Sequence, residues 1–201
     1  HLPEANEVAK VKIGHSQGGE NCPIIVYAKA LVKESSERQK QMLAHEIFHC
    51  IQDTIWREKK LGVENKVDSW WVEGSAVWFS NFIYPNTNQE NDYNFDYKGE
   101  LALTNQETPY ATHSFFQSYS QSYLGFNGVI DFIDSMPNSG GKAEQLMAVL
   151  VYPSLSMHFH NFATQLTSNQ IQDFNSTLMT TNLASEPLTI KTTDRDIKRW
   201  A

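Results

Sequence analysis

The amino-acid sequence predicts an α+β protein with a small N-terminal sheet and a mostly helical C-terminal part. A β-branched apolar run at residues 24–32 predicts a strand, and apolar residues at helical spacing over residues 42–55, preceded by capping residues at 35–37, predict a helix. Helical segments separated by turn-forming residues fill residues 109–186. Because 201 residues suffice for one substantial core, we expect a single domain over residues 1–201, with the sheet and two helices in residues 1–83.

Composition narrows the classes of partner and location. The apolar share of 40% is that of a folded globular chain, and the net charge of −7 argues against nucleic acid or an anionic membrane surface as partner. No apolar run is long enough to cross a bilayer, and no signal peptide is present. The chain begins and ends abruptly, as expected of a mature secreted protein or of a domain from a longer one. We expect a secreted or extracytoplasmic location, and the oligomeric state stays open.

The sequence contains two cysteines, Cys22 before the predicted strand and Cys50 within the first predicted helix. An even count in a secreted chain is compatible with one disulfide. Two buried thiols are an equal alternative, so both interpretations stay open.

The first predicted helix contains the sequence His45-Glu46-Ile47-Phe48-His49, and Ser35 and its neighbours provide an N-terminal cap for it. Residues four apart lie on the same face of a helix, so His45 and His49 bring two imidazoles to one point, with Glu46 beside them. This is the H-E-x-x-H arrangement, in which two histidines bind Zn²⁺ and the glutamate is the general base of a metallopeptidase. The alternative is that both are ordinary core or surface histidines.

The second predicted helix covers residues 69–79 with Ser69 as its cap, and it carries one carboxylate, Glu73, inside an aromatic and small-residue run. A carboxylate there needs a partner, because burying an unpaired charge is costly, and a metal already held by His45 and His49 would supply one. Catalytic zinc has three protein ligands and an open position for water. The sequence therefore predicts one zinc bound by His45, His49 and Glu73. We expect Gly74 and Ala76 to let the two helices approach closely.

These motifs resemble those of the gluzincin metallopeptidases, in which two histidines of H-E-x-x-H and a glutamate from a second helix bind zinc. Residues 71–76, Trp-Val-Glu-Gly-Ser-Ala, are similar to the W-x-E-G-x-A signature of that clan, as in the aminopeptidase N group and the bacterial collagenases. The 23 residues between His49 and Glu73 make a longer gap than in the aminopeptidases. The resemblance covers about residues 20–125 and implies a zincin-like (thermolysin-like) fold with zinc in a cleft between helices.

The resemblance also implies roles for residues outside the two motifs. The strand ahead of the zinc helix would pair with an extended peptide. Glu20, in Gly-Gly-Glu-Asn at residues 18–21, is similar to the amino-terminus anchor in the G-x-M-E-N motif of the aminopeptidase N group, but two of the five positions differ. A Gly-rich turn with a solvated glutamate is the alternative. Val77 stands where thermolysin-like relatives have an aspartate, so the ligating histidines must find their supporting partner elsewhere, and the sequence does not identify it.

A donor to the peptide carbonyl oxygen is expected at the start of a later helix, predicted over residues 110–124. A donor opposite the zinc would stabilise the negative charge that develops there during hydrolysis, and gluzincins use a Tyr or His for this purpose. Tyr110 aligns with the Tyr of the aminopeptidase N group, and His113 can be matched to a Y-S-F segment of the collagenases. We expect Tyr110 to be this donor and take His113 as the second candidate. The alternative is that each side chain only packs at the start of the helix.

The remaining segments have simpler interpretations. Residues 84–108 predict a long loop, either bordering the site or inserted without a role. Residues 126–133, 142–151 and 154–166 predict helices, and residues 187–191 a strand. His158 and His160 are two residues apart and face different sides of a helix, so a second metal site is not expected there.

The sequence therefore predicts a zinc-dependent metallopeptidase that hydrolyses peptide or protein substrates with a zinc-activated water and Glu46 as the general base. Endopeptidase action is favoured, because the motif around Glu20 is incomplete. One alternative is an aminopeptidase that uses Glu20 as the amino-terminus anchor. Others are a catalytically silent peptide-binding or protein-binding module on the same fold, and an enzyme of that fold acting on something other than peptides.

Overall fold

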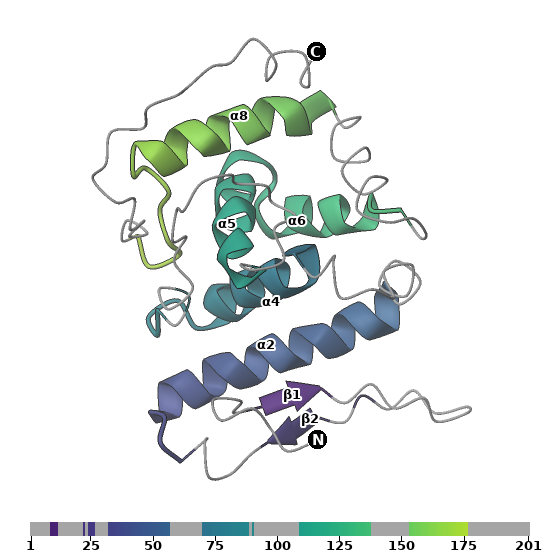
Figure 1. The fold of residues 1–201 in the computed structure, drawn as a ribbon, viewed down its shortest axis with the longest axis vertical. Helices are drawn as coiled ribbons and strands as arrows, with labels where there is room; N and C mark the ends of the chain where they lie inside the picture. The colour runs from purple at the N-terminus through teal and green to yellow at the C-terminus, as the bar shows by residue number, and fades with distance from the viewer. Residues whose placement is uncertain are drawn as a thin grey trace, which may run out of the picture.

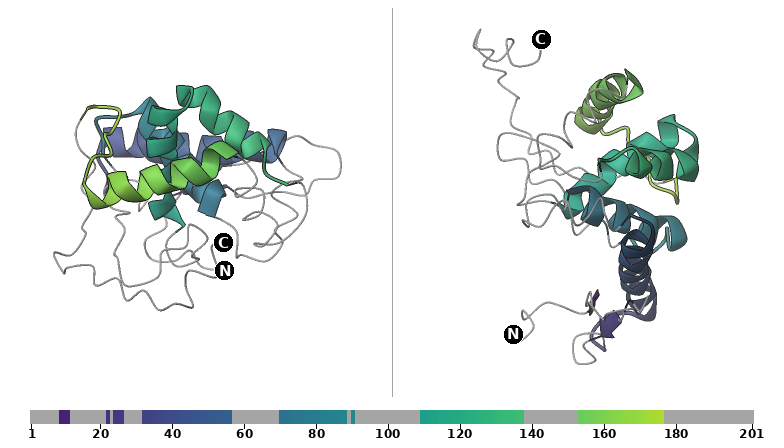
Figure 2. Two further views of the ribbon diagram at one scale, coloured as in Figure 1. Left: turned by 90° about the horizontal axis from the view of Figure 1, so that it is seen from above. Right: turned by 90° about the vertical axis from the view of Figure 1, so that its right-hand side faces the viewer.

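The structure is a computed structural model, and it describes residues 9–11, 22, 24–26, 32–56, 70–88, 90, 109–137 and 153–176. These residues confirm a mostly helical chain, whereas the sheet within them is limited to two strands of three residues each. The elements follow one another in space in chain order, from the sheet through α2 and α4 to α5, α6 and α8 (Figure 1). Figure 2 shows the same order from the side.

The sheet pairs β1 (Ala9–Val11) with β2 (Ile24–Val26) in antiparallel register, with Ala9 opposite Val26. β2 is the beginning of the strand predicted over residues 24–32, of which residues 27–31 lie outside the described part. β1 was not predicted, although apolar residues alternate with lysines over residues 9–13, which is the period of a strand. The sheet lies against α2 (Figure 1).

Helix α2 (Ser36–Ile55) confirms the first predicted helix. Ser35 is its N-cap, and the Ser35 Oγ accepts a hydrogen bond from the backbone N–H of Arg38 at 3.3 Å. Such a cap satisfies one of the free N–H groups of the first turn. The helix ends before Trp56, whose indole N–H donates to the Asp134 carboxylate at 2.5 Å.

Cys22 and Cys50 form a disulfide, which decides between the two interpretations that the sequence left open. Their Cα atoms are 5.5 Å apart, within the range that a disulfide requires. The bond links the chain just before β2 to α2, next to His49, so the segment of α2 that carries His45 and His49 is anchored covalently close to the sheet.

The remaining helices are α4 (Trp70–Ile83), α5 (His113–Ser122), α6 (Gly125–Asp134) and α8 (Pro153–Thr167). The helix predicted over residues 110–124 begins as the short 3-10 helix η2 (Tyr110–Thr112) before α5. Leu124 and Gly125 both have positive φ, 46° and 59°, and turn the chain from α5 into α6. α6 and α8 confirm the predictions at residues 126–133 and 154–166, each with slightly wider bounds.

Aromatic side chains from five helices form the core. The Trp70 ring stacks on Phe116 at a centroid distance of 6.1 Å and meets Phe115 and Phe132 edge-on. Aromatic rings prefer these stacked and T-shaped geometries. The fully buried members of the core include Phe48, Trp71, Trp78, Phe115, Phe116, Ile133, Leu166 and Ile171. Most of this core lies on the side of α4 away from the sheet, where α4 packs against α5, and α5 packs against α6 and α8 (Figure 1).

Several predictions fall on residues that the structure does not describe. These are Glu20 with its Gly-rich turn, the cap at Ser69, most of the loop at residues 84–108, the helix at residues 142–151 and the strand at residues 187–191. Among the described helices, none combines the length and apolar character that crossing a membrane requires.

Candidate metal centre

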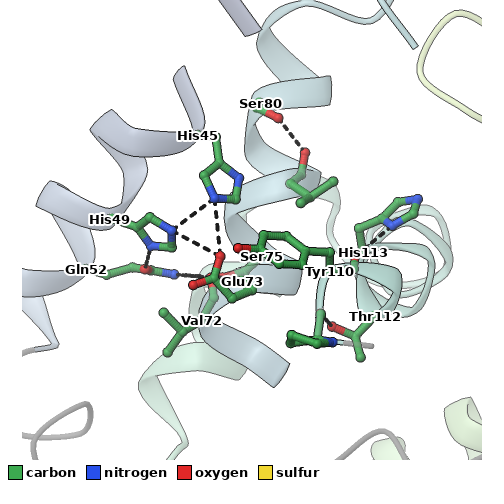
Figure 3. A network of polar contacts seen from close by, with 12 residues as sticks. His45, His49, Gln52, Val72, Glu73, Ser75, Ser80, Tyr110, Thr112 and His113 are labelled. Atoms are coloured by element: carbon green, nitrogen blue, oxygen red, sulfur yellow. Dashed lines mark hydrogen bonds and ion pairs between the residues drawn. The ribbon is translucent and has the colours of Figure 1, made fainter. Parts of the chain in front are cut away.

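Helices α2 and α4 bring three potential metal ligands together. The Nε2 atoms of His45 and His49 are 3.0 Å apart, and the Glu73 Oε2 lies 3.3 Å from each of them. The two histidines come from successive turns of α2, and the glutamate reaches them from the first turn of α4 (Figure 3). Among the residues that the structure describes, these three side chains form a group that could hold a metal ion.

The spacing of the three atoms fits a small tetrahedral cation. A tetrahedron with ligands about 2.0–2.1 Å from its centre, as around zinc, has edges of about 3.3–3.4 Å. The observed edges of 3.0, 3.3 and 3.3 Å are close to this. The Glu73 Oε2 is also buried without a hydrogen bond of acceptable geometry, although both imidazoles are near it. Such an atom is costly to bury unless a cation compensates it.

The charge on Glu73 is stabilised by its neighbours. Burial by itself raises the pKa of Glu73, but the adjacent His49 and His45 oppose this and hold the pKa of that carboxyl well below its ordinary value. Glu73 is therefore ionised at neutral pH, which is the form that binds a metal.

Gln52 connects His49 to helix α4. The Oε1 of Gln52 lies 2.8 Å from the Nδ1 of His49, the ring nitrogen that faces away from Glu73. The Nε2 of Gln52 donates to the backbone carbonyl of Val72 and to the Ser75 Oγ, both at 2.9 Å (Figure 3). Metal-binding histidines usually donate their second N–H to an oxygen, and Gln52 supplies that oxygen here. This is the supporting partner that the sequence left unidentified.

The two candidate donors at the start of α5 lie in different environments. Tyr110 is 38% exposed, and its ring stacks on His45 with centroids 6.0 Å apart. Its side chain points toward His45 and Glu73 (Figure 3). His113 is only 3% exposed, and its Nδ1 lies 2.9 Å from the Tyr110 carbonyl oxygen. Burial lowers the pKa of His113 to about 4, so it is neutral at physiological pH.

Gly74 sets the position of the segment that carries Tyr110. A Cβ at residue 74 would lie 2.0 Å from the Thr112 Oγ1 and 3.1 Å from the Thr112 carbonyl carbon. The Thr112 hydroxyl donates to the carbonyl oxygens of Trp70 and Pro109, 2.6 Å from each. The sequence predicted that Gly74 brings the two zinc helices together. The close neighbour is instead η2, because Gly74 lies on the face of α4 that packs against that segment.

Glu46 follows His45 in α2 and is partly buried. Its place on the helix, about 100° around the axis from His45, puts it beside the ligand face. Gln52 and Ser75 were missed by the sequence interpretation. Gln52 is three residues after His49 and so shares its helix face, a local signal that was available. Nothing in the sequence pairs Ser75 with Gln52, because that contact joins two helices.

No protein-family model, curated protein or solved structure matches this chain. The case for a function therefore rests on the side chains and their arrangement.

Proposed function

We propose that the chain is a zinc-dependent metallopeptidase of gluzincin type, acting on peptide or protein substrates as an endopeptidase. The observation that carries the proposal is the convergence of His45, His49 and Glu73 within 3.3 Å of one another, with Glu46 next to His45 on the same helix. Two imidazoles and one carboxylate are the ligand set of many hydrolytic zinc sites.

The residues divide the chemistry between them. Zinc, when bound to the three ligands, supplies Lewis acidity and lowers the pKa of water toward neutrality. Glu46 accepts the proton of the attacking water and returns it to the leaving nitrogen, since a carboxylate beside the site can act first as base and then as acid. Gln52 keeps the His49 ring oriented.

The geometry supports Tyr110 over His113 as the donor to the carbonyl oxygen. Tyr110 is exposed and its ring stacks on His45, so its side chain lies next to the candidate ligands. His113 is buried behind it, with Nδ1 directed to a backbone carbonyl. A donor must reach the developing oxyanion to stabilise it. We assign that role to Tyr110.

We further propose a secreted or extracytoplasmic location and a zincin-like fold. The Cys22–Cys50 disulfide supports the location, because disulfides persist in oxidising compartments. The helices α2 and α4, each presenting ligands to the same point, support the fold.

The test is zinc content by elemental analysis, with cleavage of a mixed peptide library, for the unmodified protein and for Glu46→Gln. We expect about one zinc in both proteins, because Glu46 is not a ligand. Cleavage by Glu46→Gln should fall by about 10²–10⁴-fold, the contribution of a general base. Internal cut positions would support endopeptidase action, and removal of single amino-terminal residues would favour an aminopeptidase.

Glu37→Gln is the matched control, because Glu37 lies on the same helix but is exposed and paired with Lys40 at 2.7 Å. It should retain both zinc and activity. Zinc bound without any cleavage by the unmodified protein would replace the peptidase proposal with a silent binding module. Absence of zinc from the unmodified protein would refute the metal assignment itself.

A further inference from the structure

Gln52 is fully buried, and each polar atom of its amide has a partner. One side contacts His49 on its own helix, and the other contacts Val72 and Ser75 on α4 (Figure 3). Gln52 therefore contacts the candidate ligand His49 directly and also contacts α4, the helix that carries the candidate ligand Glu73.

The orientation of the amide follows from its partners. The Val72 carbonyl oxygen only accepts hydrogen bonds, so the Gln52 nitrogen must face it at 2.9 Å. The amide oxygen then faces His49, and since that oxygen also only accepts, the His49 Nδ1 must carry the proton. A reversed amide would set its oxygen against the Val72 carbonyl oxygen at 2.9 Å, so that two acceptors would face each other.

A proton on Nδ1 leaves the Nε2 of neutral His49 as an acceptor with an unprotonated lone pair. That lone pair is directed at His45 and Glu73, where the three candidate ligand atoms meet. The opposite tautomer would place an N–H there and block coordination, because only the unprotonated nitrogen binds a metal. The amide thus selects the tautomer of His49 that can bind a metal.

The same amide holds the second ligand-bearing helix in register. Val72 is adjacent to Glu73, so the bond to its carbonyl oxygen fixes the first turn of α4 relative to His49. The Ser75 Oγ, three residues after Val72 on α4, accepts the second N–H of the amide. Loss of Gln52 would affect both the lone pair of His49 and the approach of Glu73.

We propose that Gln52 is a positioning residue that fixes the metal-binding tautomer of His49 and aligns α4 so that Glu73 completes the site. The role toward a metal rests on the proposed function, whereas the control of the His49 tautomer does not.

The test compares Gln52→Leu and Gln52→Glu with the unmodified protein. Nitrogen-15 NMR of the metal-free proteins reports the tautomer of His49, and competition with a chelator measures the affinity for Zn²⁺ alone. In Gln52→Leu we expect His49 to change from the Nδ1–H form to a mixture of tautomers. Zinc affinity should fall by about 10–100-fold, as for loss of other partners of metal-binding histidines.

Gln52→Glu keeps an oxygen toward His49, whether the new carboxyl is protonated or not. It should retain the Nδ1–H tautomer and bind zinc more tightly than Gln52→Leu does. This variant keeps the test decisive if Gln52→Leu fails to fold, which circular dichroism would reveal. A tautomer mixture in the folded Gln52→Glu protein would overturn the proposal.

Gln41→Leu is the matched control, because Gln41 is also a fully buried glutamine of α2 but bonds to Glu90 instead of a ligand. It should leave both the His49 tautomer and the zinc affinity unchanged. Equal losses in Gln41→Leu and Gln52→Leu would show a general packing effect and overturn the specific role.

If the unmodified protein binds zinc but cleaves nothing, only the peptidase proposal fails. If it binds no zinc, the alignment of a metal site is refuted, and the NMR result still decides the tautomer claim.

Discussion

Helix α2 carries two fully buried glutamines about three turns apart, and each enters a different polar cluster. Gln52 accepts from His49 and stands behind the candidate metal centre. Gln41 donates from its Nε2 to the Glu90 Oε2 at 3.0 Å. In the second cluster, the Glu90 carboxyl is hydrogen bonded to that of Asp173. Asn81, near the end of α4, donates to Asp173 at 2.5 Å.

The two clusters differ in the direction of their donors. Around His49, the Nδ1 hydrogen points outward to Gln52, and the Nε2 faces His45 and Glu73, which suits a cation. Around Glu90, amide N–H groups point inward, and burial favours the protonated form of the paired carboxyls. Burial raises the pKa of Glu90 to about 7 and also raises the pKa of Asp173. Burial of polar groups alone therefore does not distinguish a metal site; the placement of hydrogens does.

The largest expected effect comes from exchanging one carboxylate for an amide in each cluster. Glu73→Gln removes the charged ligand, so zinc content and peptide cleavage should both fall to background. Glu90→Gln should retain about one zinc and full cleavage, because Glu90 touches Gln41 and Asp173 and no metal ligand. Elemental analysis and the peptide assay measure both. Loss of zinc from Glu90→Gln would show that the two clusters depend on each other and would contradict the distinction between them.

A smaller effect is expected from Gly74→Ala, which tests how closely α4 must pack against η2 next to Glu73. The added methyl group would collide with Thr112 and displace the segment that carries Tyr110. Overpacking of this kind costs about 1–3 kcal/mol of the free energy of unfolding. Chemical denaturation would measure the loss, and the peptide assay should show reduced turnover with zinc retained.

Ser80→Ala is its control on the same helix, because the buried Ser80 hydroxyl donates to the Val77 carbonyl within α4. It should leave turnover unchanged. Unaltered stability and turnover in Gly74→Ala would mean that the contact between α4 and η2 is looser than the structure indicates.

The smallest effect concerns pH and the Glu90 cluster. The pKa of Glu90 rises from its ordinary value of 4.5 to about 7 in the folded chain, so the fold binds a proton that the unfolded chain releases. Stability is therefore lost as pH rises from about 4.5 to about 7. Glu90→Gln keeps the bond from Gln41 and offers Asp173 an amide donor in place of the proton.

Thermal unfolding should show Glu90→Gln gaining on the unmodified protein across that pH range, with no further gain above it. Burial lowers the pKa of both His113 and His158 to about 4, so each reduces stability as pH falls from 6.5 toward 4. Both histidines are present in the two proteins, so their contribution cancels in the difference. A difference that does not change with pH would refute the shared proton.

Local features of the sequence predicted much of the fold. The cap at Ser35 and the apolar periodicity of residues 42–55 located α2 closely, because capping and amphipathicity act within a few turns. The 3-10 start of the third helix was not predicted. It depends on the contact of Thr112 with Gly74 and Trp70, which lie about 40 residues away in the chain. The sequence left the disulfide undecided because its formation depends on how the chain folds. The fold must bring the Cα atoms of Cys22 and Cys50 to a distance that a disulfide can span.

The sequence by itself determined that His45 and His49 share one helix face with Glu46 beside them, because the spacing of four residues is sufficient for that. It also identified Glu73 as a carboxylate in need of a partner. The tertiary structure alone decided that the Glu73 Oε2 lies 3.3 Å from both imidazoles and that Gln52, which contacts His49, is itself bonded to Val72 of α4. It also exposed Tyr110 and buried His113. These outcomes depend on how helices distant in the chain pack together, and local sequence patterns do not encode that packing.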